Sequence, residues 1–178
     1  GDTNQAVNPL SPLVTAEEIG KIFPESEVTT LKKSYRNTVE ISEFCSRILG
    51  IENPNYMKRN GEKVTMSRLH TREDYLKALV IESVKMKKEG RTSAVIFPTG
   101  KECSELYEKY GKGAGLELVT GEDKVFKSGN VIIPAYMAKG LEFDAVLIPY
   151  NSYERGELKH VLYTAATRAL HVLKLFRY

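Results

Sequence analysis

The sequence contains few of the residues that build disulfide scaffolds and metal centres. Its 178 residues include only two cysteines, Cys45 and Cys103, and three histidines. Two cysteines are too few for a disulfide framework, and neither residue type has the spacing of zinc ligands. We therefore predict a reduced interior and no metal site.

Long apolar runs are also missing. None approaches the 18 or so residues needed to span a bilayer, and the N-terminus lacks the basic-then-apolar pattern of a secretory signal. A chain of this length, with 42% hydrophobic and 28% charged residues, can bury about 70% of its unfolded surface. We expect one folded, soluble, cytoplasmic domain with no membrane partner.

A strong charge bias and a phosphate loop are absent as well. The 26 basic and 23 acidic residues leave a net charge of +3, too small to indicate nucleic-acid binding by itself. The segments KYGKGAG (109–115) and TGK (99–101) lack both the glycine spacing and the Lys-Ser or Lys-Thr ending of a phosphate loop. We predict that the chain alone does not hydrolyse ATP.

Strand-like and helix-like segments alternate along the chain. Thr15 with Glu18, Asn37 with Glu40, and Thr99 with Glu102 have the spacing of helix N-caps. The alternation predicts an α/β fold with a doubly wound, mostly parallel sheet, whose sites lie at the carboxyl ends of the strands. A polar, hairpin-like stretch is expected between residues 119 and 131. The expected helices span 15–23, 37–49, 71–88, 99–110 and 157–170, and the expected strands span 28–31, 64–69, 93–97, 116–119, 131–133, 144–149 and 172–176.

Four polar segments occur in a distinctive order: GDTNQ (1–5), KKSYRNT (32–38), AKGLEFD (138–144) and LYTAATRAL (162–170). In this order they resemble motifs III, IV, V and VI of the superfamily 1 helicases of the UvrD, Rep and PcrA type. AKGLEFD followed by a Tyr-x-x-x-Thr-Arg-Ala helix is the most specific part. The GD-x-NQ start, the Ser-Tyr-Arg form of motif IV and the short middle region look most like the helicase IV/HelD-like group.

The resemblance implies a domain organisation. Residues 1–14 would be the end of a preceding RecA-like domain, with motif III and a connector, and residues 15–178 the second RecA-like domain, a P-loop NTPase fold without its own Walker A loop. Because motifs Q, I, Ia and II precede motif III in the family, we expect a longer polypeptide. About twenty residues separate Tyr110 from the motif V strand, so the accessory domain that UvrD-type enzymes insert there is absent or vestigial.

The resemblance assigns catalytic roles to three residues. Arg168 would be the arginine finger that reaches the γ-phosphate of ATP, for which a planar, permanently charged guanidinium is suited; alternatively it complements a helix dipole. Arg36 would approach the same phosphates, or be a surface arginine. Gln5 would link the γ-phosphate to bound DNA, or lie in a frayed terminus.

Three further residues are candidates for nucleotide binding. By resemblance Tyr35 would pack on the adenine and Glu142 would accept from the ribose hydroxyl, and Gly140 allows a close approach of the loop. The alternatives are strand-end packing for Tyr35 and a helix or turn cap for Glu142. The implied cofactor is ATP with Mg²⁺, whose metal ligands we expect in the preceding domain.

Four residues are candidates for contact with single-stranded DNA. Tyr136, where the family usually has histidine, could stack on a base, and Lys139 could meet a phosphate or be solvated. For Thr99 we favour a helix N-cap over a nucleic-acid contact, while Lys101 could bind a phosphate at the helix start.

The resemblance therefore implies the C-terminal motor domain of an ATP-dependent DNA helicase or translocase. Its partners would be single-stranded DNA and the N-terminal RecA-like domain of the same polypeptide. The alternative is a HelD-like ATPase domain, associated with RNA polymerase and acting mainly in protein remodelling.

Overall fold

The computed structural model describes residues 15–25, 27, 29, 36–51, 58–121, 129–154 and 158–178. Gln5, Tyr35 and the motif III segment and connector predicted for residues 1–14 lie outside these ranges, as does most of the predicted strand at 28–31.

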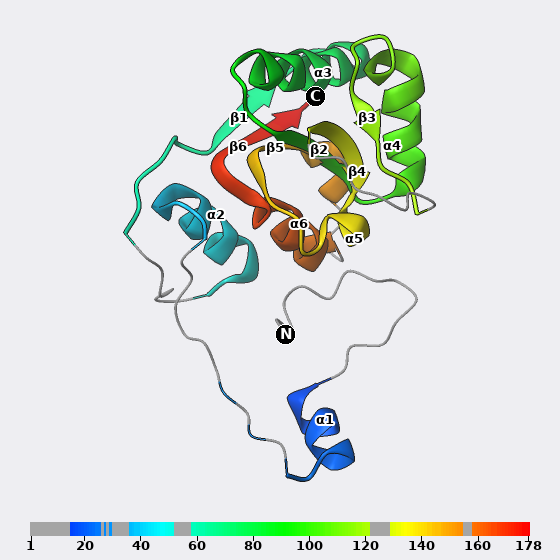
Figure 1. Ribbon diagram of the computed structural model, residues 1–178. Coiled ribbons are helices and arrows are strands. Elements are labelled where there is room, and N and C mark those ends of the chain that lie inside the picture. The colour runs from blue at the N-terminus through cyan, green and yellow to red at the C-terminus, as the bar shows by residue number, and fades with distance from the viewer. Residues whose placement is uncertain are drawn as a thin grey trace.

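The core of the fold is a six-stranded sheet in the order β1-β6-β5-β2-β4-β3 (Figure 1). Every pair of neighbouring strands is parallel, which confirms the predicted parallel α/β sheet. The strands are β1 (Thr65–Arg68), β2 (Ser93–Phe97), β3 (Glu117–Leu118), β4 (Asn130–Pro134), β5 (Phe143–Pro149) and β6 (Ala169–Arg177).

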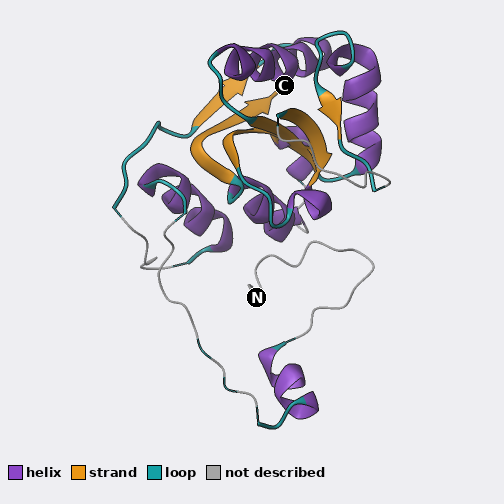
Figure 2. Cartoon of the chain, in the orientation of Figure 1, coloured by secondary structure: helices purple, strands orange, loops and turns teal. Residues whose placement is uncertain are grey.

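Helices cover both faces of this sheet (Figure 2). Alternate residues of β2 point to opposite faces: Ile96 packs with α2, α5 and α6, while Val95 packs with α3 and α4. Such strands are buried on both sides, which explains their nearly continuous apolar sequences.

The helices are α1 (Ala16–Ile22), α2 (Val39–Leu49), α3 (Arg72–Lys88), α4 (Gly100–Leu106), α5 (Ala135–Ala138) and α6 (Lys159–Ala166), with a π-helical turn at Tyr107–Gly111 and a 3₁₀ turn at Tyr150–Tyr153. Among the described helices, none is long and apolar enough to cross a membrane.

Two Thr-x-x-Glu caps are confirmed and one predicted cap is wrong. The Thr15 hydroxyl accepts from the Glu18 amide, and the Thr99 hydroxyl accepts from the Glu102 amide. In α2, however, Thr38 occupies the N-cap position, because the Asn37 side chain is directed to the turn before β6 instead.

Two further predictions differ from the structure. The last helix ends at Ala166 rather than Leu170, and Ala169 already belongs to β6. The strands β3 and β4 are parallel neighbours, so they do not form the expected hairpin.

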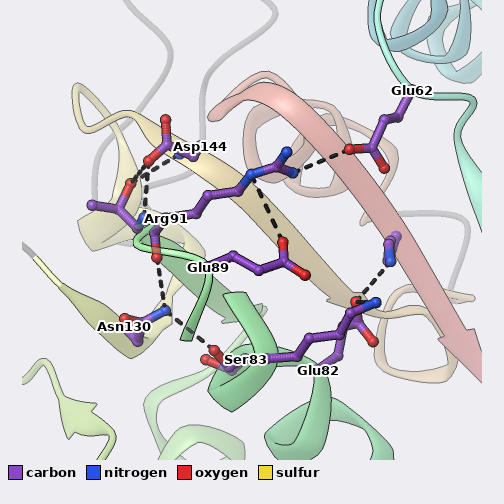
Figure 3. A network of polar contacts seen from close by, with 10 residues as sticks. Glu62, Glu82, Ser83, Glu89, Arg91, Asn130 and Asp144 are labelled. Atoms are coloured by element: carbon purple, nitrogen blue, oxygen red, sulfur yellow. Dashed lines mark hydrogen bonds and ion pairs between the residues drawn. The ribbon is translucent and has the colours of Figure 1, made fainter. Parts of the chain in front are cut away.

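A buried polar network joins α3 to the amino ends of β2 and β4 (Figure 3). The Asn130 amide donates to Ser93 Oγ at 2.7 Å and to the carbonyls of Ser83 and Arg91, both at 3.3 Å. The hydroxyls of Ser83 and Ser93 lie 2.8 Å apart. At the same end of the sheet, the Arg91 guanidinium lies between the carboxylates of Glu62 and Glu89.

Replacing Asn130 by alanine should destabilise the fold. The substitution removes the shared donor and leaves buried carbonyl and hydroxyl oxygens without it, which costs about 1–3 kcal/mol in the free energy of unfolding. Urea unfolding measures this change, with the exposed Asn60→Ala as the control. Equal stabilities of the two variants would contradict the importance of the network.

Candidate functional site

The predicted site residues that the structure describes lie at two opposite edges of the sheet. Glu142 and Arg168 directly precede β5 and β6, so they lie at the amino ends of these strands. Thr99 and Tyr136 follow β2 and β4, so they lie at the carboxyl ends. The prediction that all sites lie at the carboxyl ends is therefore wrong for Glu142 and Arg168, whose segments enter strands rather than leave them.

The structure brings Arg36, Glu142 and Arg168 together at the amino edge. Arg36 Nε contacts Glu142 Oε1 at 2.5 Å, and the two side chains are 44% and 40% exposed. Arg168 Nη1 donates to the carbonyl of Leu141, the residue before Glu142, at 3.4 Å. The Phe143 amide also donates to the Arg168 carbonyl at 3.0 Å, so these two segments are held side by side. We call these three residues the arginine–glutamate cluster.

Within this cluster Arg168 is almost completely buried. Its side chain is 1% exposed, and besides Leu141 it contacts the Thr164 carbonyl through Nε at 3.1 Å and Thr167 Oγ1 through Nη2 at 3.0 Å. A guanidinium can be buried only where oxygen acceptors satisfy its donors. Because Thr164 belongs to the last turn of α6, these contacts also place the positive charge at the negative end of the helix dipole.

The buried thiol of Cys45 lies close to this charge. Burial raises the pKa of Cys45 to about 12, and the positive charge of Arg168 opposes part of that rise. The thiol is therefore protonated at neutral pH. Cys45 is part of the packing of α2 against α6 rather than a nucleophile.

Gly140 forms the turn that leads into Glu142. Its φ of +89° lies in the region that glycine adopts at little cost. A Cβ built at this position would meet no atom within 4 Å, so the backbone conformation, not crowding, favours glycine. The neighbouring Lys139 is exposed on the same turn.

At the opposite edge, Thr99, Lys101 and Tyr136 line one groove of about 910 Å³. Tyr136 is 44% exposed, and a Cβ at Gly100 would lie 3.5 Å from its hydroxyl. Lys139 is not among the groove residues. The favoured N-cap assignment of Thr99 is confirmed, since Thr99 Oγ1 also contacts Glu102 Oε2 at 2.7 Å.

The groove combines aromatic rings with balanced charge. Tyr75 and Tyr178 line it with ring centroids 4.9 Å apart. The Arg72 guanidinium forms two contacts with the Glu105 carboxylate, at 2.7 and 2.8 Å, and it lowers the pKa of Glu105. Tyr75 is 2% exposed, so the rings open to solvent for base stacking are those of Tyr136 and Tyr178, which are 44% and 45% exposed.

Sequence reasoning missed three polar residues at the amino edge. Asp144 accepts from the Thr92 amide and hydroxyl, both at 2.8 Å, and its own amide donates to Thr92 Oγ1 at 3.0 Å. Asn37 and Arg59 contact main-chain oxygens far away in the sequence. Asp144 belongs to the AKGLEFD segment, so a motif in the sequence pointed to it. Arg59 lies in none of the four motif segments, and no sequence pattern pointed to it.

The carboxylate of Asp144 should make stability depend on pH. Burial alone would raise its pKa, but the hydrogen bonds from Thr92, with the charges of His171 and Arg91, hold the pKa below its ordinary value. A lowered folded-state pKa means that Asp144 stabilises the fold above its unfolded pKa of about 4, and that this contribution disappears as the pH falls through the lower folded value.

We therefore expect Asp144→Asn to reduce the loss of stability on acidification below pH 4. Urea unfolding of the wild type and the variant between pH 2.5 and 6 measures it. An identical pH profile for both proteins would show that Asp144 does not contribute in this way.

Comparisons with known proteins agree with this architecture. Residues 131–175, which include Glu142 and Arg168, match the family described as UvrD-like helicase C-terminal domain. The chain is similar to the solved C-terminal domain of a possible DNA helicase from Lactobacillus plantarum WCFS1. The sequence identity is 28% and the TM-score 0.65, over 81% of this chain and 87% of that chain. No curated protein matches the sequence. The motifs, the parallel sheet and these two similarities together support a C-terminal domain of the UvrD-type, superfamily 1 helicases.

Proposed function

We propose that this domain is the second motor domain of an ATP-dependent DNA helicase or translocase, and that the arginine–glutamate cluster is its half of the ATP site. The observation that carries the proposal is the meeting of Arg36, Glu142 and Arg168 at one edge of the sheet. These residues come from three segments that are far apart in the sequence. Two permanently charged guanidiniums beside one carboxylate suit a ligand with several phosphates and a sugar hydroxyl.

The exposed part of the cluster fits a nucleotide. Arg36 and Glu142 are both partly open to solvent, so Arg36 can exchange its carboxylate partner for phosphate oxygens and leave Glu142 to accept from a hydroxyl. When bound, ATP with Mg²⁺ supplies the phosphoanhydride whose cleavage drives the motor. Among the described residues, no group of three or more histidines, cysteines, aspartates or glutamates could hold a metal ion, and we propose that the Mg²⁺ ligands belong to the preceding domain.

Arg168 must change its contacts to act as an arginine finger. In this structure its guanidinium faces oxygens of its own domain, and the 3.4 Å hydrogen bond to Leu141 is the longest of the three described. Rotation away from Leu141 would turn the Nη atoms toward a ligand beside Glu142. Closure of the two RecA-like domains on ATP would supply the acceptor oxygens for this rotation.

We propose single-stranded DNA as the ligand of the groove at the carboxyl edge. Tyr136 provides an exposed ring for base stacking, and Lys101 and Thr99 lie along the same groove. Tyr136 precedes Glu142 by only six residues, so α5 and the Gly140 turn connect the groove to the arginine–glutamate cluster. A change at the nucleotide can therefore alter the grip on the strand.

A HelD-like function at RNA polymerase was the alternative from the sequence. Neither comparison supports RNA polymerase as a partner. The roles suggested for Gln5 and Tyr35 concern residues outside the described ranges, and they stay predictions.

Removal of the finger should abolish hydrolysis by the full-length polypeptide. Arginine fingers contribute about 10³–10⁵ to the rate of phosphoryl transfer in other NTPases, so Arg168→Ala should lower single-turnover hydrolysis about a thousandfold. The control is Arg68→Ala, an exposed arginine on β1. Normal hydrolysis by Arg168→Ala, or ATP turnover by the 178 residues alone, would contradict the proposal.

The groove can be tested through the salt dependence of binding. Tyr136→Ala should weaken binding of an oligothymidylate by about 1–3 kcal/mol without changing the salt slope. If Lys101 contacts a phosphate, Lys101→Ala should reduce the slope by about 0.7. Lys112→Ala, an exposed lysine outside the groove, is the control. Unchanged affinity in Tyr136→Ala would exclude this groove as the path of the strand.

A further inference from the structure

The turn that carries Arg168 has main-chain carbonyls that need donors from outside α6 and β6. The Asn37 amide nitrogen donates to two of them, Thr167 O at 3.2 Å and Ala169 O at 2.6 Å. These carbonyls belong to the residues directly before and directly after Arg168. Because Asn37 is 6% exposed, water has little access to replace its amide.

The side chain of Arg59 forms hydrogen bonds with the main chain of two separate segments. Arg59 Nη2 donates to the carbonyl of Arg36 and, at 3.0 Å, to the carbonyl of Leu170. The Arg59 guanidinium therefore joins the main chain at Arg36 to β6, the strand that follows Arg168. Asn37 and Arg59 together form what we call the clasp.

The clasp is itself held in place against the start of α2. The Val39 amide donates to the Arg59 carbonyl at 2.9 Å, and the Gly61 amide donates to Glu40 Oε2 at 2.8 Å. A Cβ at Gly61 would lie 2.5 Å from Thr38 Cγ2. Since real Cβ atoms do not approach so closely, any larger residue at position 61 would displace either Thr38 or the segment that carries Arg59.

We infer that Asn37 and Arg59 are positioning residues that fix the distance between Arg36 and Arg168. The inference rests on the proposed function, in which both guanidiniums meet the same phosphates. Neither clasp residue touches the ligand. Without the clasp, the Arg36 segment and the Arg168 turn lose the hydrogen bonds that join their main chains through Asn37 and Arg59. A misplacement of about 1 Å is then enough to cost a hundredfold in rate.

The first test measures order in the full-length polypeptide without nucleotide. In Asn37→Ala and Arg59→Ala, amide hydrogen exchange should become at least about tenfold faster in peptides covering residues 36–45 and 163–171. Asn130→Ala is the matched control, because it removes another buried amide that donates to main-chain carbonyls, in the network of Figure 3. Unchanged exchange in both clasp variants would overturn the inference, as would an increase in Asn130→Ala that is equally concentrated in these two peptides relative to the rest of the chain.

The second test separates positioning from stability. Asn37→Ala and Arg59→Ala should lower kcat for ATP hydrolysis roughly tenfold to a hundredfold with little change in KM. Combined with Arg168→Ala, they should add no further loss. Gly61→Ala should have the same effect, although it removes no donor. A normal kcat per folded molecule in all three variants would overturn the inference.

The two tests distinguish failure of the clasp from failure of the proposed function. If Arg168→Ala abolishes hydrolysis while the clasp variants keep normal exchange and kcat, only the clasp is wrong. If Arg168→Ala hydrolyses ATP normally, the proposed function is wrong, and the positioning inference fails with it even where exchange has increased.

Discussion

The structure depends on how a positively charged side chain is accommodated in the turn between α6 and β6. Arg168 is 1% exposed, and such burial is tolerated only when surrounding oxygens accept its hydrogen bonds. The last turn of α6, the Thr167 hydroxyl and the Leu141 carbonyl provide them. The Leu141 contact and the hydrogen bond from the Phe143 amide to the Arg168 carbonyl attach the segment before β5 to the turn before β6, so Glu142 and Arg168 lie close together.

The fold separates two kinds of chemistry along the strands. At the amino edge several charged side chains have partners: Arg36 contacts Glu142, Arg91 lies between two carboxylates, and Asp144 accepts from Thr92. At the carboxyl edge an aromatic groove has its basic Arg72 neutralised by Glu105. The short α5 segment is the direct covalent connection between Tyr136 and Glu142. A motor that converts hydrolysis into movement along a strand needs such a connection.

Much of this architecture could be predicted from local sequence. The strands β2 and β5 are apolar runs because both of their faces are covered, and two Thr-x-x-Glu patterns marked helix starts because the cap is a local interaction.

The end of α6 was missed because alanine and leucine at 169 and 170 continue a helical pattern, while pairing with β5 draws them into a strand. Asn37 has the pattern of a cap, but its partners lie 130 and 132 residues away. The bonds of Arg59 span 23 and 111 residues, so no local pattern reveals them.

The central claim is that Arg36, Glu142 and Arg168 face one nucleotide. A crystal structure of the full-length polypeptide with Mg²⁺ and a non-hydrolysable ATP analogue tests this claim most directly. We expect both guanidiniums within hydrogen-bonding distance of the terminal phosphate and Glu142 on the ribose, with the bond between Arg168 and Leu141 broken. An analogue bound in a closed complex, with Arg168 still held by Thr164, Thr167 and Leu141, would contradict the claim.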